Sequence, residues 1–200
     1  MSTSPPFPLL TDTLDRAHQL AHHEGHRLDQ PQFELDDAHE RHSGPGVCWR
    51  VEARTLISDP TDKVLCRWHA GERTRAVNEL AGERDELAAR YLVYRSQHLD
   101  IRTLWVPHLP LTRHGEFLAH VFRVQARAGF QVAVAAPGTA LPSLLVYPGR
   151  HFYFLHHTAQ GRPHGATRVN APRPATALAD HIEAVARDGQ GIHAFTRRQL

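Results

Sequence analysis

Residues 98–107 read HLDIRTLWVP, residues 128–137 read AGFQVAVAAP, and residues 144–157 read LLVYPGRHFYFLHH. The first two segments are short apolar runs, and the helical pattern of Thr112–Ala128 separates them. A strand, a helix and a second strand in this order predict a βαβ unit with parallel strands. The third segment places a Pro-Gly turn between two apolar runs, which predicts an antiparallel hairpin.

The first seventy residues predict a helix followed by a second hairpin. Apolar residues recur at helical spacing from Thr11 to Arg27. Gln32–Leu35 and Val47–Ile57 alternate with period two, so we expect two paired strands with one buried face. Between them, Asp36–Gly46 is rich in charge, Gly and Pro and predicts a surface loop, while residues 1–10 are expected to form a flexible lead-in.

A long amphipathic helix is predicted from Thr74 to Leu99, and a closing helix from Thr176 to Arg187. The long helix either contributes to a homodimer interface or lies across the sheet. Together the elements predict an α+β fold with an α/β-like second half, in which helices cover a mixed sheet. Residues 11–200 would form one compact domain with subregions 11–70 and 71–200.

Composition bounds the domain count and the class of protein. The chain has 200 residues, of which 41% are hydrophobic, and this is typical of one compact domain. The net charge is only +2, yet residues 1–100 carry −5 and residues 101–200 carry +7. Either the two halves attract one another, or the basic half faces an anionic partner.

The cysteine count and a stretch without charged residues indicate in which cellular compartment the protein is expected. Cys48 and Cys66 are too few for a disulfide scaffold, and the first eight residues lack the features of a signal peptide. Residues 128–149 are uncharged, but Gln, Pro and Gly interrupt them, so we expect two strands and no membrane span. A cytoplasmic protein is predicted. Arg makes up 22 of the 23 basic residues, which indicates a GC-rich bacterial genome.

The 17 histidines include a group at helical spacing, and these are His18, His22 and His26. Two imidazoles four residues apart can reach one Zn²⁺ or Ni²⁺ ion. The third lies about 12 Å from the first along the helix, so all three cannot bind one ion. A metal site, adventitious binding of a divalent metal and a plain solvated face all remain open, and no cofactor is predicted.

A second group of basic and titratable side chains surrounds the last predicted hairpin. Its members are Arg150, His151, His156, His157, His164 and Arg168, and no carboxylate falls among them in the sequence. Guanidinium and imidazole groups near a strand end suit a phosphate or carboxylate ligand. The alternative is an exposed rim whose charge balances the acidic first half.

Common catalytic motifs are absent. There is no Gly-x-Ser-x-Gly, no phosphate loop ending in Gly-Lys-Ser/Thr, and no Gly-x-Gly-x-x-Gly after a strand. The commonest hydrolases, nucleotide phosphatases and dinucleotide enzymes are therefore excluded.

The order of elements over residues 76–187 resembles one half of a phospholipase-D-like domain, as used in bacterial regulatory proteins. That family carries a catalytic His-x-Lys motif, expected near the last hairpin. Here the hairpin has His151-Phe152-Tyr153, and no Lys follows Lys63. The resemblance therefore implies a non-catalytic relative, similar to the sensing or interaction domains of transcriptional regulators.

Three functions are consistent with these features. The first is a non-enzymatic, ligand-sensing or protein-interaction module that captures a small anionic ligand or a protein partner. The second is a phosphodiesterase-like hydrolase that uses the His and Arg group. The third, not favoured, is nucleic-acid binding through the basic second half.

Overall fold

The computed structural model describes residues 8–56 and 59–200, and the strands of this part form one mixed sheet. In chain order the strands are β1 His26–Leu28, β2 Gly46–Glu52, β3 Leu99–Trp105, β4 Gln131–Val134, β5 Leu144–Tyr147, β6 His151–His157, β7 Pro163–Val169 and β8 Gln190–Gly191. Across the sheet their order is β1-β7-β6-β5-β2-β3-β4-β8. The fold class is α+β, as the sequence predicts.

The helices of the described residues are α1 Pro8–Glu24, α2 Gln30–His42, α3 Lys63–Ala70, α4 Arg73–Gly82, α5 Arg84–Ser96, α6 Arg113–Arg127, α7 Pro172–Asp188 and α8 Ile192–Gln199. Strands β2, β3 and β4 are parallel, and every other pairing is antiparallel. β3, α6 and β4 form the predicted βαβ unit, and β5 and β6 form the predicted hairpin. Both features are confirmed.

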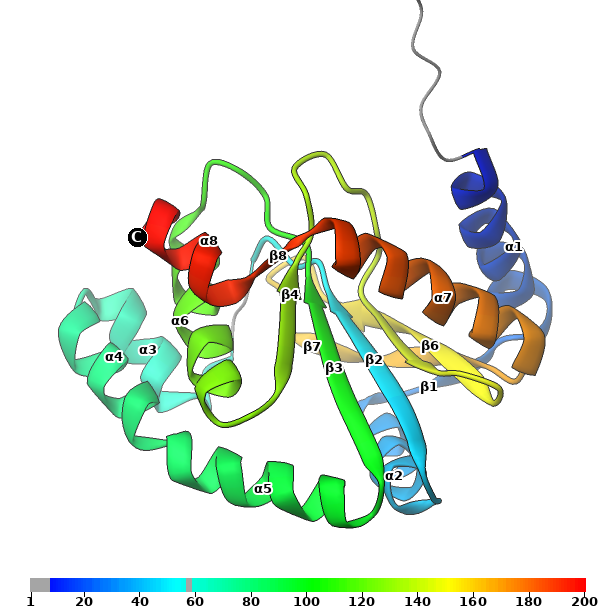
Figure 1. Ribbon diagram of the computed structural model, residues 1–200, viewed down its shortest axis with the longest axis horizontal. Coiled ribbons are helices and arrows are strands. Elements are labelled where there is room, and N and C mark those ends of the chain that lie inside the picture. The colour runs from blue at the N-terminus through cyan, green and yellow to red at the C-terminus, as the bar shows by residue number, and fades with distance from the viewer. Residues whose placement is uncertain (1–7, 57–58) are drawn as a thin grey trace, which may run out of the picture.

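Helices cover both faces of the sheet (Figure 1). Helices α1 and α7 pack side by side on one face, where an apolar cluster includes Trp49, Phe152 and Ile182. On the other face, α3, α4, α6 and α8 cover β3 and β4 around Trp105. Helix α2 packs on β7 beside a third cluster, to which Tyr153 belongs. The core thus lies in two layers on either side of the sheet.

The predicted first hairpin and the loop Asp36–Gly46 are wrong, because residues 30–42 form helix α2. Asp29 accepts a hydrogen bond from the amide of Gln32, whose side chain accepts one from the Asp29 amide, and Pro31 sits in the first turn. This capping box and the proline start a helix. The charged residues after it lie on that helix, so polarity alone did not indicate a loop.

The predicted helix Thr74–Leu99 is also wrong, because it is two helices and a strand residue. α4 ends at Gly82, and α5 begins at Arg84 in a new direction. The amide of Glu83 is shared between the carbonyls of Glu79 and Leu80, as at many helix ends. Leu99 already belongs to β3. The break lets α4 pack on α3 while α5 follows the lower edge of the domain.

Several elements have no counterpart among the predicted ones. β7, the short strands β1 and β8, and α8 were not expected. Residues 8–10, part of the predicted flexible lead-in, are helical, and residues 1–7 lie outside the described residues. Among the described helices, none has the length and apolar character that crossing a bilayer requires.

Candidate functional site

Strand β6 presents alternate residues to opposite faces of the sheet, so it divides the predicted basic group. His151 and Tyr153 lie on the face covered by α2, and Phe152 and Phe154 lie on the face covered by α1 and α7. A β-bulge between Leu155 and His157 interrupts this alternation; His156 contacts Thr167 of β7, whereas His157 lies beside Arg54 and Glu52.

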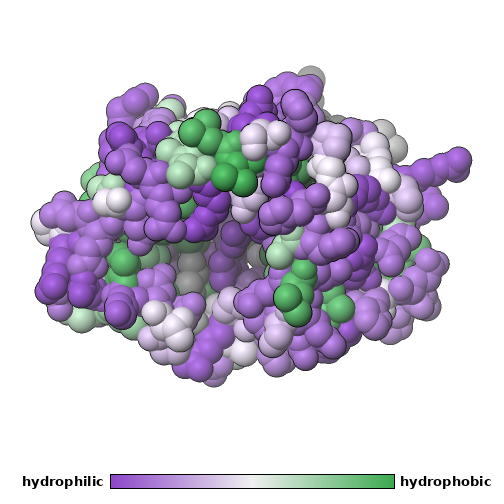
Figure 2. Space-filling model, turned by 90° about the horizontal axis from the view of Figure 1, so that it is seen from below, coloured by the Kyte–Doolittle hydropathy of each residue, from purple (hydrophilic) through white to green (hydrophobic). Residues whose placement is uncertain are grey.

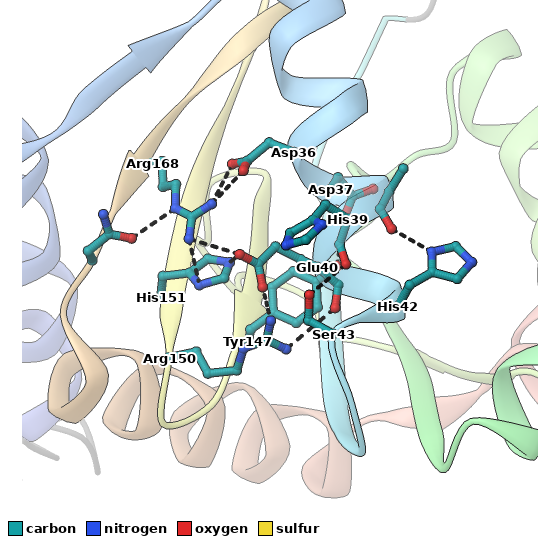
Figure 3. A network of polar contacts seen from close by, with 12 residues as sticks. Asp36, Asp37, His39, Glu40, His42, Ser43, Tyr147, Arg150, His151 and Arg168 are labelled. Carbon is teal, nitrogen blue, oxygen red and sulfur yellow. Dashed lines mark hydrogen bonds and ion pairs between the residues drawn. The ribbon is translucent and has the colours of Figure 1, made fainter.

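Arg168 of β7 lies at the centre of a network between the sheet and α2, which we call the α2 ion network (Figure 3). Its Nη1 donates to both carboxylate oxygens of Asp36 at 2.6 and 2.7 Å, and its Nη2 donates to Glu40 Oε1 at 2.9 Å. Its Nε donates to Asn170 at 2.8 Å. Arg150 forms a second ion pair with Glu40.

Two tyrosines complete the contact with α2. The Tyr153 hydroxyl donates to Asp36 at 2.8 Å, and the Tyr147 hydroxyl donates to Asp37 at 2.7 Å. The buried residues of α2 are Asp37 and Glu40, both acidic. Charge and hydrogen bonding therefore hold much of this helix to the sheet.

Burial and charge set the protonation states in the network. Burial opposes ionisation of Asp36, but the hydrogen bonds from Arg168 and Tyr153 outweigh it and hold the pKa of Asp36 below its usual value. Burial, together with the charges of Arg168 and Arg150, lowers the pKa of His151 to about 3. His151 is neutral near pH 7, and its Nε2 is buried without a hydrogen-bond partner among the described residues.

The network pairs charges of the acidic half with charges of the basic half. Arg150 and Arg168 come from the basic half, and they pair with Asp36 and Glu40 from the acidic half. Of the predicted basic group, the network brings together Arg150, His151 and Arg168, as expected. The network also contains carboxylates that the sequence analysis did not predict there. The capping box at Asp29 is the signal that could have found them, because a helix there places residues 36, 37 and 40 near one another.

Lowering the pH from 7.5 to 5 should reduce the free energy of unfolding. The unfolded chain takes up protons on histidine near pH 6.5, whereas folded His151 and His157 have pKa values of about 3 and 4. Each such group contributes a slope of at most about 1.4 kcal/mol per pH unit below pH 6.5. Urea unfolding at several pH values measures the slope. His151→Phe should flatten it, and equal slopes would contradict this assignment.

A separate cavity of about 350 Å³ opens at the carboxyl end of β2, and we call it the β2 cavity. Strand β2 pairs in parallel with β3 and antiparallel with β5, so the cavity lies where the parallel part of the sheet meets the antiparallel part. Ligands of open α/β sheets bind beyond the carboxyl ends of strands, and the cavity lies beyond that end of β2. The lining residues are Ala53, Arg54, Thr55, Leu56, Leu141, Pro142, Ser143, Leu155, His157, Thr158, Ala159 and Gly161.

Glu52 anchors the charged wall of this cavity. Its side chain is 3% exposed and accepts hydrogen bonds from Arg54 Nε at 2.7 Å and Arg54 Nη2 at 2.6 Å. Arg50 Nη2 approaches it at 3.3 Å. Burial favours the protonated form of Glu52, but Arg54 and Arg50 outweigh it and lower its pKa.

His157 lies beside these charges and is neutral near pH 7. Burial lowers its pKa to about 4, the charges of Arg54 and Arg50 lower it as well, and Glu52 opposes them. Ser143 Oγ accepts a hydrogen bond from the amide of Ala53 at 3.3 Å, so its hydroxyl proton can still be donated. Arg54, His157 and Ser143 therefore offer polar groups at one end of the sheet.

The helices do not cover the sheet completely on the α2 side. Arg50 belongs to an internal strand, yet 42% of its side chain is exposed. Figure 2 shows the molecule hollowed at the centre when seen from below, with apolar patches on the rim of the hollow.

Of the remaining predicted residues, His26 lines a second pocket, of about 630 Å³, together with Asp36 and Arg168 of the α2 ion network. His156 Nε2 is 2.7 Å from Thr167 Oγ1, and His164 is exposed. His26 lies on β1, beyond the end of α1, so the expected stack of His18, His22 and His26 on one helix is wrong. His18 instead stacks on Phe154 at 4.5 Å. Across residues 8–56 and 59–200, no three His, Cys, Asp or Glu side chains come together to hold a metal ion.

Comparison with known proteins gives a family and distant structural likenesses. No curated protein matches the chain. The solved structure of TrmBL2, an archaeal chromatin protein that binds DNA, is 6% identical, with a TM-score of 0.42 over 96% of this chain. This chain spans 57% of the TrmBL2 chain. The family model for "Domain of unknown function (DUF6879)" matches residues 39–197, and the chain therefore belongs to this family.

Proposed function

We propose that the protein is a non-enzymatic module of a bacterial regulatory system that senses a small anionic ligand in the β2 cavity. The observation that carries this proposal is the position of Arg54, Ser143 and His157 around an open cavity. This cavity lies where the parallel part of the sheet meets the antiparallel part. The resemblance of residues 76–187 to a phospholipase-D-like domain without its catalytic motif is in keeping with binding and not catalysis.

The β2 cavity is a better ligand site than the rim formed by Arg150 and Arg168. Both guanidinium groups are engaged with carboxylates of α2, so an incoming anion would have to displace Asp36 or Glu40. Of the predicted basic group, His157 is the member that lines the cavity.

The alternative functions have weaker support. A hydrolase built on His156, His157 and His164 would need them at one site, but only His157 lines the β2 cavity, and His156 contacts Thr167 instead. Nucleic-acid binding would use the basic half, of which Arg150 and Arg168 are already paired with acidic residues.

A protein partner stays a prediction, and so does the homodimer through residues 74–99. Within that range, Leu92 and Val93 of α5 are exposed large hydrophobic residues.

A thermal-shift screen with a blocking variant tests the proposal. Ala159 is exposed and lines the cavity, so Ala159→Trp should fill it without disturbing the core. The exposed Ala89 of α5 provides the matched control Ala89→Trp. The panel contains carboxylates, sugar phosphates, nucleotides, short oligonucleotides and divalent metals at pH 6 and 7.5.

We expect an anionic compound to stabilise the wild-type protein and Ala89→Trp, but not Ala159→Trp. A ligand at one hundred times its dissociation constant adds about 2.7 kcal/mol, which such a screen detects. The proposal fails if no anion shifts the transition, or if the shift persists in Ala159→Trp.

A further inference from the structure

The charges around the β2 cavity set the charge of the ligand. Arg50 and Arg54 are positive, Glu52 is negative, and His157 is neutral, so this group carries +1. A ligand with one negative charge would neutralise this group. A second negative charge would lie beside Glu52, which is nearly buried and within 2.7 Å of the same guanidinium group. Like charges at this range in a partly buried site repel strongly.

Two hydrogen-bond donors lie beside the charged wall of the cavity. Arg54 uses Nε and Nη2 on Glu52, which leaves Nη1 without a hydrogen-bond partner among the described residues. The Ser143 hydroxyl is the second donor, since it serves as an acceptor for Ala53. These two donors match the two oxygens of a carboxylate, and His157, Thr55 and Thr158 place further polar groups in the lining.

Part of the lining is apolar, and a purely polar ligand would leave this part uncovered. Half of the lining residues are apolar, and these are Ala53, Leu56, Leu141, Pro142, Leu155 and Ala159. A volume of about 350 Å³ lies at the small end of the range for ligand sites. An apolar chain or ring of modest size would remove this surface from water.

We propose, on the basis of the function proposed above, that the ligand is a monocarboxylate with a compact apolar body. Its carboxylate binds Arg54 Nη1 and the Ser143 hydroxyl, and its apolar part contacts Leu141 and Leu155. Glu52 positions Arg54 and, through its own charge, excludes ligands with two negative charges.

Three compounds of equal chain length test this assignment at pH 7.5: octanoate, octan-1-ol and octyl phosphate. We expect octanoate to bind tightest. Octan-1-ol lacks the charge and should bind at least about tenfold more weakly, because a hydrogen bond to a charged group is lost. Octyl phosphate, close to a dianion at this pH, should also bind at least about tenfold more weakly. Calorimetric titration gives the dissociation constants.

The variant Glu52→Gln provides a second readout, because it raises the charge of the group from +1 to +2. The preference for octanoate over octyl phosphate should fall by about tenfold. Circular dichroism checks that this variant is folded, and the wild-type comparison stands if it is not. Ala159→Trp should bind none of the three compounds.

The outcomes separate this inference from the proposed function. If octyl phosphate or octan-1-ol binds the wild-type protein as tightly as octanoate, the monocarboxylate is wrong. The monocarboxylate is also wrong if no octyl compound binds while an anion of the panel other than a monocarboxylate binds and is blocked by Ala159→Trp. In that case the sensing function survives. If no anion binds at all, both proposals fail.

Discussion

Arg168→Met should lower the free energy of unfolding by about 2–3 kcal/mol, below the usual cost of removing one partner from a fully buried ion pair, because Arg168 and Asp36 are only partly buried. Arg168 contributes hydrogen bonds to Asp36, Glu40 and Asn170, and methionine keeps the length of the side chain without its charge. Asp36 would retain the Tyr153 hydroxyl, and Glu40 would retain Arg150. Two carboxylates would nonetheless lose much of their compensating charge between α2 and the sheet.

Urea unfolding at pH 7.5 measures the effect, and Arg173→Met provides the control. Arg173 is an exposed arginine in the first turn of α7, so its substitution should cost less than about 0.5 kcal/mol. Adding Asp36→Asn to Arg168→Met should recover about 1 kcal/mol, because it removes one uncompensated charge. Equal losses for Arg168→Met and Arg173→Met would show that the network contributes nothing to stability.

Gly165→Ala should destabilise the protein by about 2–5 kcal/mol through the pairing of β1 with β7. Gly165 has φ of +93°, and a Cβ atom there would lie 2.1 Å from the carbonyl oxygen of Leu28. A left-handed backbone costs about 1–2 kcal/mol for a residue with a side chain. The clash adds about 1–3 kcal/mol, because backbone must move to relieve it.

Gly138→Ala separates the two causes. Gly138 has a similar φ of +84°, but a Cβ atom there would meet nothing within 4 Å. Its cost should therefore be the backbone contribution alone. Hydrogen exchange should also show loss of protection in β1 for Gly165→Ala and not for Gly138→Ala. If the two variants are equally stable, the close approach of β1 to β7 does not matter for the fold.

The two predictions address the elements that the sequence identified least well. β7 was not expected, and the segment that forms α2 was predicted as strand and loop. Both carry polar residues toward a neighbour, so their hydrophobic patterns are weak. A pattern of apolar spacing cannot indicate an element that charge and hydrogen bonding hold in place.

For the α2 ion network, the basic side chains could be predicted from the sequence, but the carboxylates that pair with them could not. Arg150, His151 and Arg168 do lie together, because strands β6 and β7 are adjacent. Asp36 and Glu40 lie more than 100 positions away along the chain, and only the packing of α2 on β7 brings them to those arginines. The β2 cavity likewise joins Arg54, Ser143 and His157 from three separate strand ends.

By itself, the sequence determined the α+β class, the βαβ unit from β3 to β4 and the hairpin from β5 to β6. These elements depend on local apolar spacing, helix capping and turn residues, which neighbouring residues encode directly. Only the tertiary structure decided which charges are neutralised and where the sheet stays open. Charge pairing and cavities depend on residues far apart in the chain, and their contacts exist only once the sheet has assembled.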